Sequence, residues 1–251
     1  MTIYNPHTIV EQFHLLFLEQ LGRLVDKKLT ILKGGCNLRF FLKSIRYSED
    51  MDIDIQTIAK ETLQKNVRKI FSSPAFKMAL KERSIEISAY SEPKQTQTVQ
   101  RWKVRLKTEQ TAASLNTKIE FSRRGIEKPV HFGTIDPNIL RNYQLTPTFF
   151  GHYTGEAALS QKIEALAGRT ETQARDVFDI YHLLRIGADL KKSLFNLKVD
   201  FLKTKENALS LSFSDFKSQV LSYLPAESQK NYDSAIWDQM LLEVIDLLEV
   251  K

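Results

Sequence analysis

The stretch that decides the fold is Leu29–Ile55, LTILKGGCNLRFFLKSIRYSEDMDIDI. It begins with a short apolar run, Leu29–Leu32, which a diglycine, Gly34-Gly35, brings to an end. It closes with a second run, Met51–Ile55, in which apolar and acidic residues alternate. Short apolar or alternating runs bounded by turn residues are typical of strands. The stretch therefore predicts a strand, a tight turn, a short helix and a second strand.

The diglycine turn has the chemistry of a phosphate-binding loop. Gly34 and Gly35 let the backbone approach a phosphate closely, and the free amides at the start of the following helix attract an anion. Asn37 is expected to cap that helix, which would run to about Ser44. No Gly-Lys-Ser/Thr follows, so this is not the Walker pattern. A purely structural turn is the alternative interpretation.

The acidic strand carries the clearest chemical pattern. Asp50, Asp52 and Asp54 alternate with apolar residues, so in a strand all three carboxylates point to one face. Like charges about 7 Å apart repel one another, and a divalent cation bound by carboxylate oxygens removes that cost. The spacing predicts that Asp50 and Asp52 share a metal ion or flank a metal pair, and that Asp54 lies too far from Asp50 to join them. A solvated polar face is the alternative.

Periodicity along the rest of the chain predicts an α+β (α/β) protein. The expected helices are 6–28 and 58–72, followed by strands 84–91, 100–108 and 115–122, a mixed region 129–155, and helices 156–167, 173–186, 207–223 and 232–249. We expect a mixed β-sheet with flanking helices over residues 1–155 and a helical domain over 156–251.

Composition restricts the class of protein. The 251 residues are 42% hydrophobic and 26% charged, which is ordinary for a globular protein. No apolar run is long enough for a membrane span, no secretory signal is evident, and a single cysteine fits a reducing compartment, so no membrane is expected and the cytoplasm is predicted. The net charge of +6 favours anionic partners such as nucleotides or nucleic acid.

The deciding stretch also resembles a known signature. KGGCNLRFFLKSIRYSEDMDIDI is similar to that of the AbiEii/AbiGii nucleotidyltransferase toxin family, within the DNA polymerase β-like nucleotidyltransferase superfamily. The matching residues are Lys33, Gly34, Gly35, Arg46, Ser48, Asp50 and Asp52. Cys36 stands where Thr or Ser is common, and a thiol is a weak donor. The resemblance implies a nucleotide site formed by Lys33, Gly34, Gly35, Cys36, Asn37, Arg46, Ser48 and Lys162, with Asn37 or backbone amides replacing any lost hydroxyl contact.

A second segment resembles the family's second signature. LSQKIEALAGRTETQARDVFDIYHLL matches it at Lys162, Ala165, Leu166, Arg169, Arg175, Asp176 and Asp179. The resemblance implies that Lys162 contacts nucleotide phosphates and that Asp176 or Asp179 supports catalysis or orients the cations. The residues alone also allow a snorkelling Lys162 and an intrahelical Arg175–Asp179 salt bridge.

Superfamily sites use a third carboxylate, and the resemblance assigns it to Glu120 in the strand TKIEF. Glu120 would complete the metal site with Asp50 and Asp52 or accept a proton; a surface pair with Lys118 is the alternative. The strand RWKVRLK places four cations, Arg101, Lys103, Arg105 and Lys107, on one face. We favour solubilising charges there over contacts to triphosphate or RNA.

The resemblance implies a metal-dependent nucleotidyltransferase. Using Mg²⁺ or Mn²⁺, it would transfer a nucleoside monophosphate from a nucleoside triphosphate to an acceptor hydroxyl, with RNA, notably the tRNA 3′ end, as the expected acceptor. The setting would be a toxin–antitoxin or phage-defence system with a cognate antitoxin. The alternatives are a small-molecule or protein acceptor, phosphoryl transfer with the same metals, and a nucleotide-binding module without activity.

Overall fold

The structure is a computed structural model that describes residues 5–194 and 197–249. The chain forms two compact units. Unit 1 comprises residues 1–41 and 47–153, and unit 2 comprises residues 42–46 and 154–251. The short segment Leu42–Arg46 thus groups with the C-terminal half rather than with its sequence neighbours.

Unit 1 contains a seven-stranded mixed sheet, in the order β3-β4-β5-β2-β1-β7-β6. The strands are β1 (Thr30–Lys33), β2 (Met51–Ile55), β3 (Ile85–Gln95), β4 (Val99–Thr108), β5 (Thr111–Ser122), β6 (Val130–Thr134) and β7 (Phe149–Tyr153). β2 runs parallel to β5, and β1 runs parallel to β7, whereas the other neighbours are antiparallel. The predicted mixed sheet and α+β class are confirmed.

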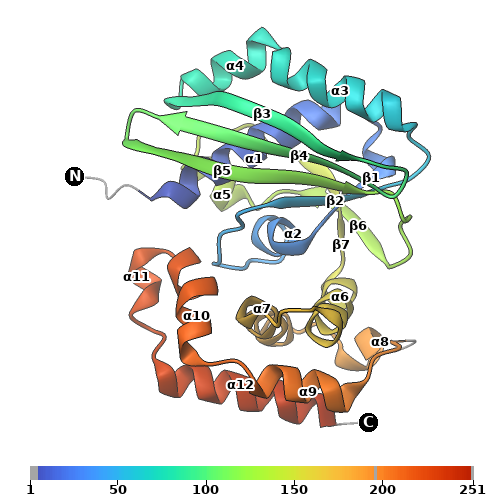
Figure 1. Ribbon diagram of the computed structural model, residues 1–251, viewed down its shortest axis with the longest axis vertical. Helices are drawn as coiled ribbons and strands as arrows, with labels where there is room; N and C mark the ends of the chain where they lie inside the picture. Colours follow the sequence, from blue (N-terminus) through green and yellow to red (C-terminus); the bar gives the residue numbers. More distant parts are fainter. Residues whose placement is uncertain (1–4, 195–196, 250–251) are drawn as a thin grey trace. The chain divides into compact units, whose positions relative to one another are not determined.

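One face of this sheet is the hydrophobic core. The helices of unit 1 are α1 (Pro6–Leu24), the 3₁₀ turn η1 (Lys27–Leu29), α2 (Gly34–Phe40), α3 (Lys60–Ser72), α4 (Pro74–Lys81) and α5 (Pro137–Asn142). Aromatic residues of α1, α3 and α4 pack with Trp102 and Phe121, which are fully buried. Figure 1 shows α3 and α4 on one side of the sheet and α2 on the other. Gly34, the first residue of α2, lies against Asp52 on the polar side of β2.

Unit 2 is helical throughout the residues that the structure describes. Its elements are α6 (Gly155–Gly168), α7 (Ala174–Arg185), α8 (Leu190–Leu194), α9 (Phe201–Leu209), α10 (Phe213–Gln219), the 3₁₀ turn η2 (Leu221–Tyr223), α11 (Ala226–Gln229) and α12 (Ser234–Glu249). α6 and α7 form its centre, where Leu159, Ile163 and Val177 are fully buried. None of the described helices combines the length and apolar character needed to cross a bilayer.

The boundaries of two predicted helices were wrong, for local reasons. The first helix after the diglycine begins at Gly34, with Lys33 as the N-cap residue, so Asn37 lies inside it and it ends at Phe40 rather than near Ser44. The segment 207–223, expected as one helix, is broken into α9, α10 and η2. The break falls where the Ser212 side chain caps the start of α10 in a reciprocal capping box.

The register of the sheet generates a prediction about Gly151, which pairs with Ile31 on β1. A Cβ added at Gly151 would lie 2.6 Å from Ile31 Cδ1 and 3.0 Å from the Thr30 carbonyl oxygen. Both neighbours lie in the closely packed sheet, so Gly151→Ala forces strain and should lower the free energy of unfolding by about 1–3 kcal/mol.

Gly133→Ala is the matched control, because Gly133 lies on the adjacent strand and an added Cβ meets nothing closer than 3.5 Å. Urea titrations of both variants give the comparison. Equal stability of the two would contradict the packing described for β1 and β7.

Candidate functional site

A row of charged side chains crosses the polar face of the sheet. Asp52 on β2 pairs in register with Lys33 on β1 and with Glu120 on β5, and Glu120 pairs with Arg101 on β4. Residues paired in register point to the same face. The predicted metal ligands Asp52 and Glu120 therefore lie side by side, with one cation beyond each of them.

Most carboxylates on this face are neutralised by a nearby cation. Lys118 Nζ lies 3.0 Å from Asp50 Oδ2, and the Lys118 backbone amide donates to Asp50 Oδ1. Arg101 Nε lies 2.6 Å from Glu120 Oε2, so Glu120 pairs with Arg101 and not with Lys118, the partner that the alternative interpretation gave it. The repulsion that favours a metal ion on this face is thus reduced by basic side chains.

Asp54 forms a separate pair at the other end of β2. Lys33 Nζ lies 2.6 Å from Asp54 Oδ1, and the Tyr153 hydroxyl donates to Asp54 Oδ2. Lys33, predicted to bind nucleotide, is therefore engaged with the aspartate that the spacing excluded from the metal site.

Asp52 differs from its neighbours. Its half-buried carboxylate makes no hydrogen bond or ion pair with any residue in the described part of the chain. Burial raises its pKa above the usual range, against the opposing effect of the Lys118 and Lys33 charges. Gly34 lies directly against it: φ is +64°, and a Cβ there would lie 3.1 Å from Asp52 Oδ2. The diglycine thus brings bare backbone beside an uncompensated carboxylate.

A buried polar chain lies behind Asp50. The Cys36 thiol is fully buried, 3.6 Å from His14 Nδ1 and 3.3 Å from the Asp50 carbonyl oxygen. His14 Nε2 lies 2.7 Å from Thr117 Oγ1, which in turn donates to the Glu49 carbonyl. Burial raises the pKa of the Cys36 thiol and lowers that of His14 to about 3. Sequence analysis missed His14 and Thr117, which lie 103 residues apart.

Two further predicted residues also support the backbone here. The Ser48 hydroxyl donates to the Asp50 carbonyl oxygen. The Asn37 side-chain amide donates to the Tyr153 carbonyl oxygen, and its buried Oδ1 has no hydrogen-bond partner in the described structure. Both side chains therefore hold the elements around the acidic strand in place.

Unit 2 holds the second group of predicted residues in a buried ionic cluster. Lys162 Nζ lies 3.0 Å from Asp176 Oδ1 and 2.7 Å from Asp179 Oδ2. Arg46, from the short segment that belongs to this unit, contacts Asp179 at 2.8 Å. Arg169 contacts Asp176 at 2.6 Å. Three cations thus surround two fully buried carboxylates.

This cluster corrects two expectations. The described structure contains no Arg175–Asp179 ion pair, because Asp179 points inward to Arg46 and Lys162. Lys162 does not snorkel to solvent, since its side chain is only 10% exposed. Despite full burial, the charges of Arg46 and Lys162 lower the pKa of Asp179 to about 2.

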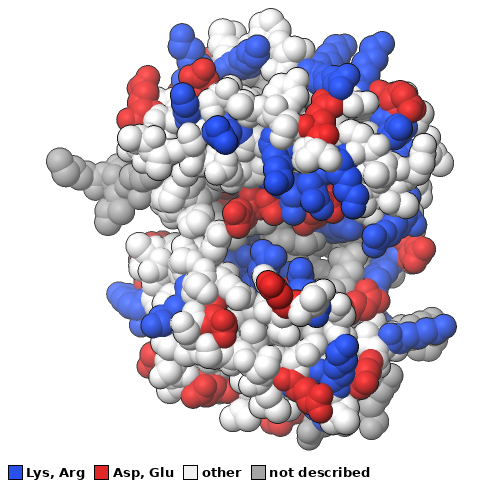
Figure 2. Space-filling model, in the orientation of Figure 1, with Lys and Arg blue, Asp and Glu red and all other residues white. Residues whose placement is uncertain are grey.

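An open groove of about 560 Å³ adjoins Asp50 on the polar face. Its charged lining residues are three cations, Lys103, Arg105 and Lys118, and two carboxylates, Glu49 and Asp50. The alternation predicted for β4 is confirmed, because Lys103 and Arg105 are exposed whereas Trp102 and Val104 are buried. Figure 2 shows Lys and Arg side chains gathered over the strands of unit 1, with acidic residues beside them.

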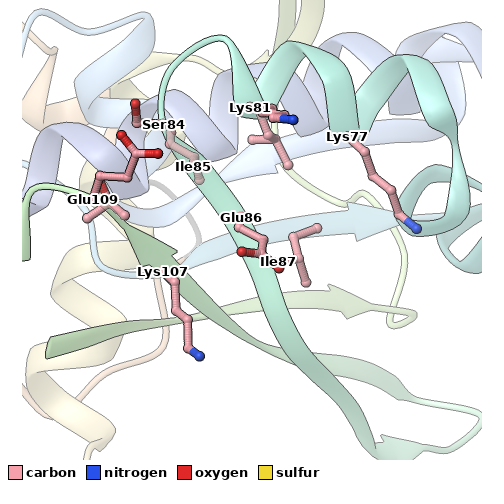
Figure 3. A pocket seen from close by; sticks show the side chains of 10 residues that line it. Lys77, Lys81, Ser84, Ile85, Glu86, Ile87, Lys107 and Glu109 are labelled. Atoms are coloured by element: carbon pink, nitrogen blue, oxygen red, sulfur yellow. The ribbon is translucent and has the colours of Figure 1, made fainter. Parts of the chain in front are cut away.

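A second cavity, of about 610 Å³, lies beside α4 and the start of β3 (Figure 3). Its lysines, Lys77, Lys81 and Lys107, are mixed with Glu86 and Glu109, and none of the predicted metal ligands lines it. Within the described residues, no three His, Cys, Asp or Glu side chains are arranged to hold a metal ion. The carboxylate row thus has the oxygen ligands of a metal site, but Asp50 and Glu120 are engaged in ion pairs with Lys118 and Arg101.

The fold and the acidic strand beside a diglycine helix start define the class of protein, a nucleotidyltransferase. The chain belongs to the family described as nucleotidyl transferase AbiEii toxin, type IV toxin–antitoxin system, whose model matches residues 16–248. It is therefore a nucleotidyltransferase toxin of such a system. No curated protein matches the sequence.

Solved structures support the fold. MenT4, a nucleotidyltransferase toxin from Mycobacterium tuberculosis, is similar with a TM-score of 0.68 at 16% identity, covering 97% of this chain and 86% of MenT4. A putative nucleotidyltransferase from Helicobacter pylori gives 0.61 at 21% identity, covering 96% and 92% of the two chains. JHP933 from the same organism gives 0.61 at 18% identity, covering 99% and 93%.

The buried cluster generates a prediction about stability. The folded pKa of Asp179, about 2, lies below its ordinary value of 3.8, so its charge stabilises the fold above about pH 4. That contribution is lost as the pH falls from about 4 to about 2. Asp179→Asn leaves Arg46 and Lys162 buried without this charge and should cost about 3–5 kcal/mol at neutral pH.

Urea unfolding of unit 2 as a function of pH tests this. The Asn variant should lack the component of acid destabilisation that Asp179 supplies. Asp238→Asn, which removes an exposed carboxylate on α12, is the control and should change stability little. Equal effects of the two variants would contradict the claim that the charge of Asp179 stabilises the fold.

Proposed function

We propose that Asp50, Asp52 and Glu120 hold a divalent cation and that the protein transfers a nucleoside monophosphate from a nucleoside triphosphate to RNA. The observation that carries this is Asp52. A half-buried carboxylate that lacks a partner, pressed against the bare backbone of Gly34, is costly unless a ligand compensates it.

The donor set fits such an ion. Asp50, Asp52 and Glu120 offer only hard carboxylate oxygens, which suit Mg²⁺ or Mn²⁺, and the last two are adjacent in register. Lys118 and Arg101, which now neutralise two of these carboxylates, would be released when the cation binds. A bound ion would supply charge neutralisation to the triphosphate and lower the pKa of the attacking hydroxyl.

The remaining steps, phosphate binding and proton acceptance, fall to residues of the chain. The Gly34-Gly35 backbone would approach the phosphates, with Lys33 offering a cation from the preceding strand. The acceptor oxygen forms a bond to the α-phosphorus while the α–β phosphoanhydride bond breaks, so pyrophosphate leaves with that electron pair. The acceptor proton would pass to a carboxylate on this face, for which we propose Glu120.

The acceptor proposed here is RNA, with the tRNA 3′ end as the specific candidate. The groove beside Asp50 is open and lined by Lys103, Arg105 and Lys118, which matches a phosphate backbone better than a small neutral molecule. We therefore propose that the cations of β4 contact RNA, whereas the sequence alone favoured a solubilising role for them. The expected phosphate contact of Lys162 and the catalytic roles of Asp176 and Asp179 stay proposals, supported by the family signature.

The antitoxin is the second proposed partner. The family of toxins to which the chain belongs is described for type IV toxin–antitoxin systems, which pair a toxin with an antitoxin.

The direct test uses total RNA, Mg²⁺ and each nucleoside triphosphate labelled at the α- or the γ-phosphate. We expect α-label in RNA, at the tRNA 3′ end. Asp52→Asn, which keeps the side-chain shape but removes the charge, should lower transfer about hundredfold or more without unfolding the chain. Glu109→Gln, on the exposed turn after β4, is the control and should be neutral.

Other outcomes separate the alternatives. γ-Label in product means phosphoryl transfer, and α-label in protein or a small molecule means a different acceptor. Full activity of Asp52→Asn would remove that residue from the mechanism and overturn the proposed site.

A second test addresses the groove. Lys103→Glu combined with Arg105→Glu should weaken RNA binding and reduce the salt dependence of binding by about one unit of slope for each lost phosphate contact. Lys77→Glu combined with Lys81→Glu, on α4, makes the same change in net charge outside the groove. Equal weakening by both double variants would show that only net charge matters.

A further inference from the structure

Asp50 is half-buried and lies just outside the strand ladder, although a metal ligand must be held precisely. The ladder between β2 and β5 begins at Met51, which pairs with Ile119, so Asp50 lies one residue before it. The preceding residue, Glu49, lies in a bend and is exposed. The backbone at 49–50 must therefore be fixed by side chains, because the ladder between β2 and β5 does not reach it.

We infer that Cys36, His14 and Thr117 form a directed hydrogen-bond chain that positions Asp50, with His14 as the neutral tautomer protonated on Nε2. In this chain His14 Nε2–H donates to Thr117 Oγ1, and the Thr117 hydroxyl donates to the Glu49 carbonyl. The Cys36 thiol lies at the other end, where it can donate to the Asp50 carbonyl oxygen or to the unprotonated His14 Nδ1. The inference rests on the proposed function for its consequence, since Asp50 is a proposed metal ligand.

The opposite direction fails on distance. Reversing the chain would send the Thr117 proton to His14 Nε2, the Nδ1 proton to sulfur and the thiol proton to the Asp50 carbonyl. Thr117 Oγ1 and the Glu49 carbonyl oxygen would then face each other at 2.7 Å with no proton between them, a distance that only a hydrogen bond permits.

The proposed direction creates no such conflict. With Nδ1 unprotonated, the Cys36 thiol is the donor at both of its contacts, the Asp50 carbonyl oxygen at 3.3 Å and His14 Nδ1 at 3.6 Å. That carbonyl already accepts from the Ser48 hydroxyl at 2.8 Å. A doubly protonated His14 would satisfy the same contacts, but it would bury a positive charge whose two ring nitrogens face a thiol and a hydroxyl rather than a carboxylate.

The hydrogen-bond chain connects three elements behind the acidic face. Cys36 lies in α2, two residues after Gly34, His14 lies in α1, and Thr117 lies in β5 beside Lys118. Thr117 and Lys118 together hold the 49–50 segment. The Thr117 hydroxyl donates to the Glu49 carbonyl, and the Lys118 backbone amide donates to the Asp50 carboxylate. Cys36 is thus a positioning residue that ties the diglycine helix to Asp50.

The first test measures the tautomer and needs no activity. In protein labelled with ¹⁵N-histidine, the His14 ring should show a pyrrole-type Nε2 and a pyridine-type Nδ1 at neutral pH. The signal is the one lost in His14→Gln, and it is retained when each of the other four histidines is replaced. A protonated Nδ1, alone or with Nε2, would overturn the inference.

The second test measures the consequence for Asp50. Thr117→Val keeps the shape but removes the hydroxyl, so the Mg²⁺ concentration for half-maximal transfer should rise about ten- to hundredfold. Thr117→Ser keeps the hydroxyl and should restore the wild-type Mg²⁺ dependence. Equal Mg²⁺ dependence of the two variants would contradict the positioning role. If the wild type transfers no nucleotide, the proposed function fails while the tautomer result stands.

Discussion

Electrostatic repulsion among carboxylates on one face of a sheet is the constraint on which the rest of unit 1 depends. The opposite face of β2 must carry Met51, Ile53 and Ile55 into the core, so the intervening aspartates have no choice of side. Lys33, Lys118 and Arg101 compensate three of the four carboxylates that gather there. The fourth, Asp52, is left beside Gly34, and that residual cost is what a bound cation would remove.

The carboxylates of unit 2 are compensated in a different way. There two fully buried aspartates are surrounded by Lys162, Arg46 and Arg169, and removal from water is offset by direct ion pairs. The interpretation of Asp176 and Asp179 as parts of one cluster follows from this geometry. A catalytic role for either carboxylate would have to operate through the cations that enclose it.

Local patterns predicted the fold well where periodicity was strict. The strand Met51–Ile55 and the alternation around Trp102 follow from the side-chain period of two, which burial on one face enforces. Helix ends were predicted less well. Asn37 has the chemistry of a cap, yet the positive φ of Gly34 starts the helix three residues earlier, and Ser212 breaks a pattern that apolar spacing alone makes continuous.

Contacts between distant residues were beyond the sequence. Arg46 and Asp179 are 133 positions apart, and His14 and Thr117 are 103 apart, so neither pairing leaves a spacing signal. Lys118 was the alternative partner for Glu120, because residues two apart along one strand point to the same face. Only the register of β4 against β5 places Arg101 directly opposite Glu120.

The most direct measurement is a crystal structure with Mn²⁺ and a non-hydrolysable nucleoside triphosphate, with the metal located by its anomalous signal. We expect a peak coordinated by Asp50, Asp52 and Glu120, with phosphate oxygens against the Gly34-Gly35 backbone. A metal bound elsewhere at saturating Mn²⁺, or a nucleotide remote from the diglycine, would contradict it.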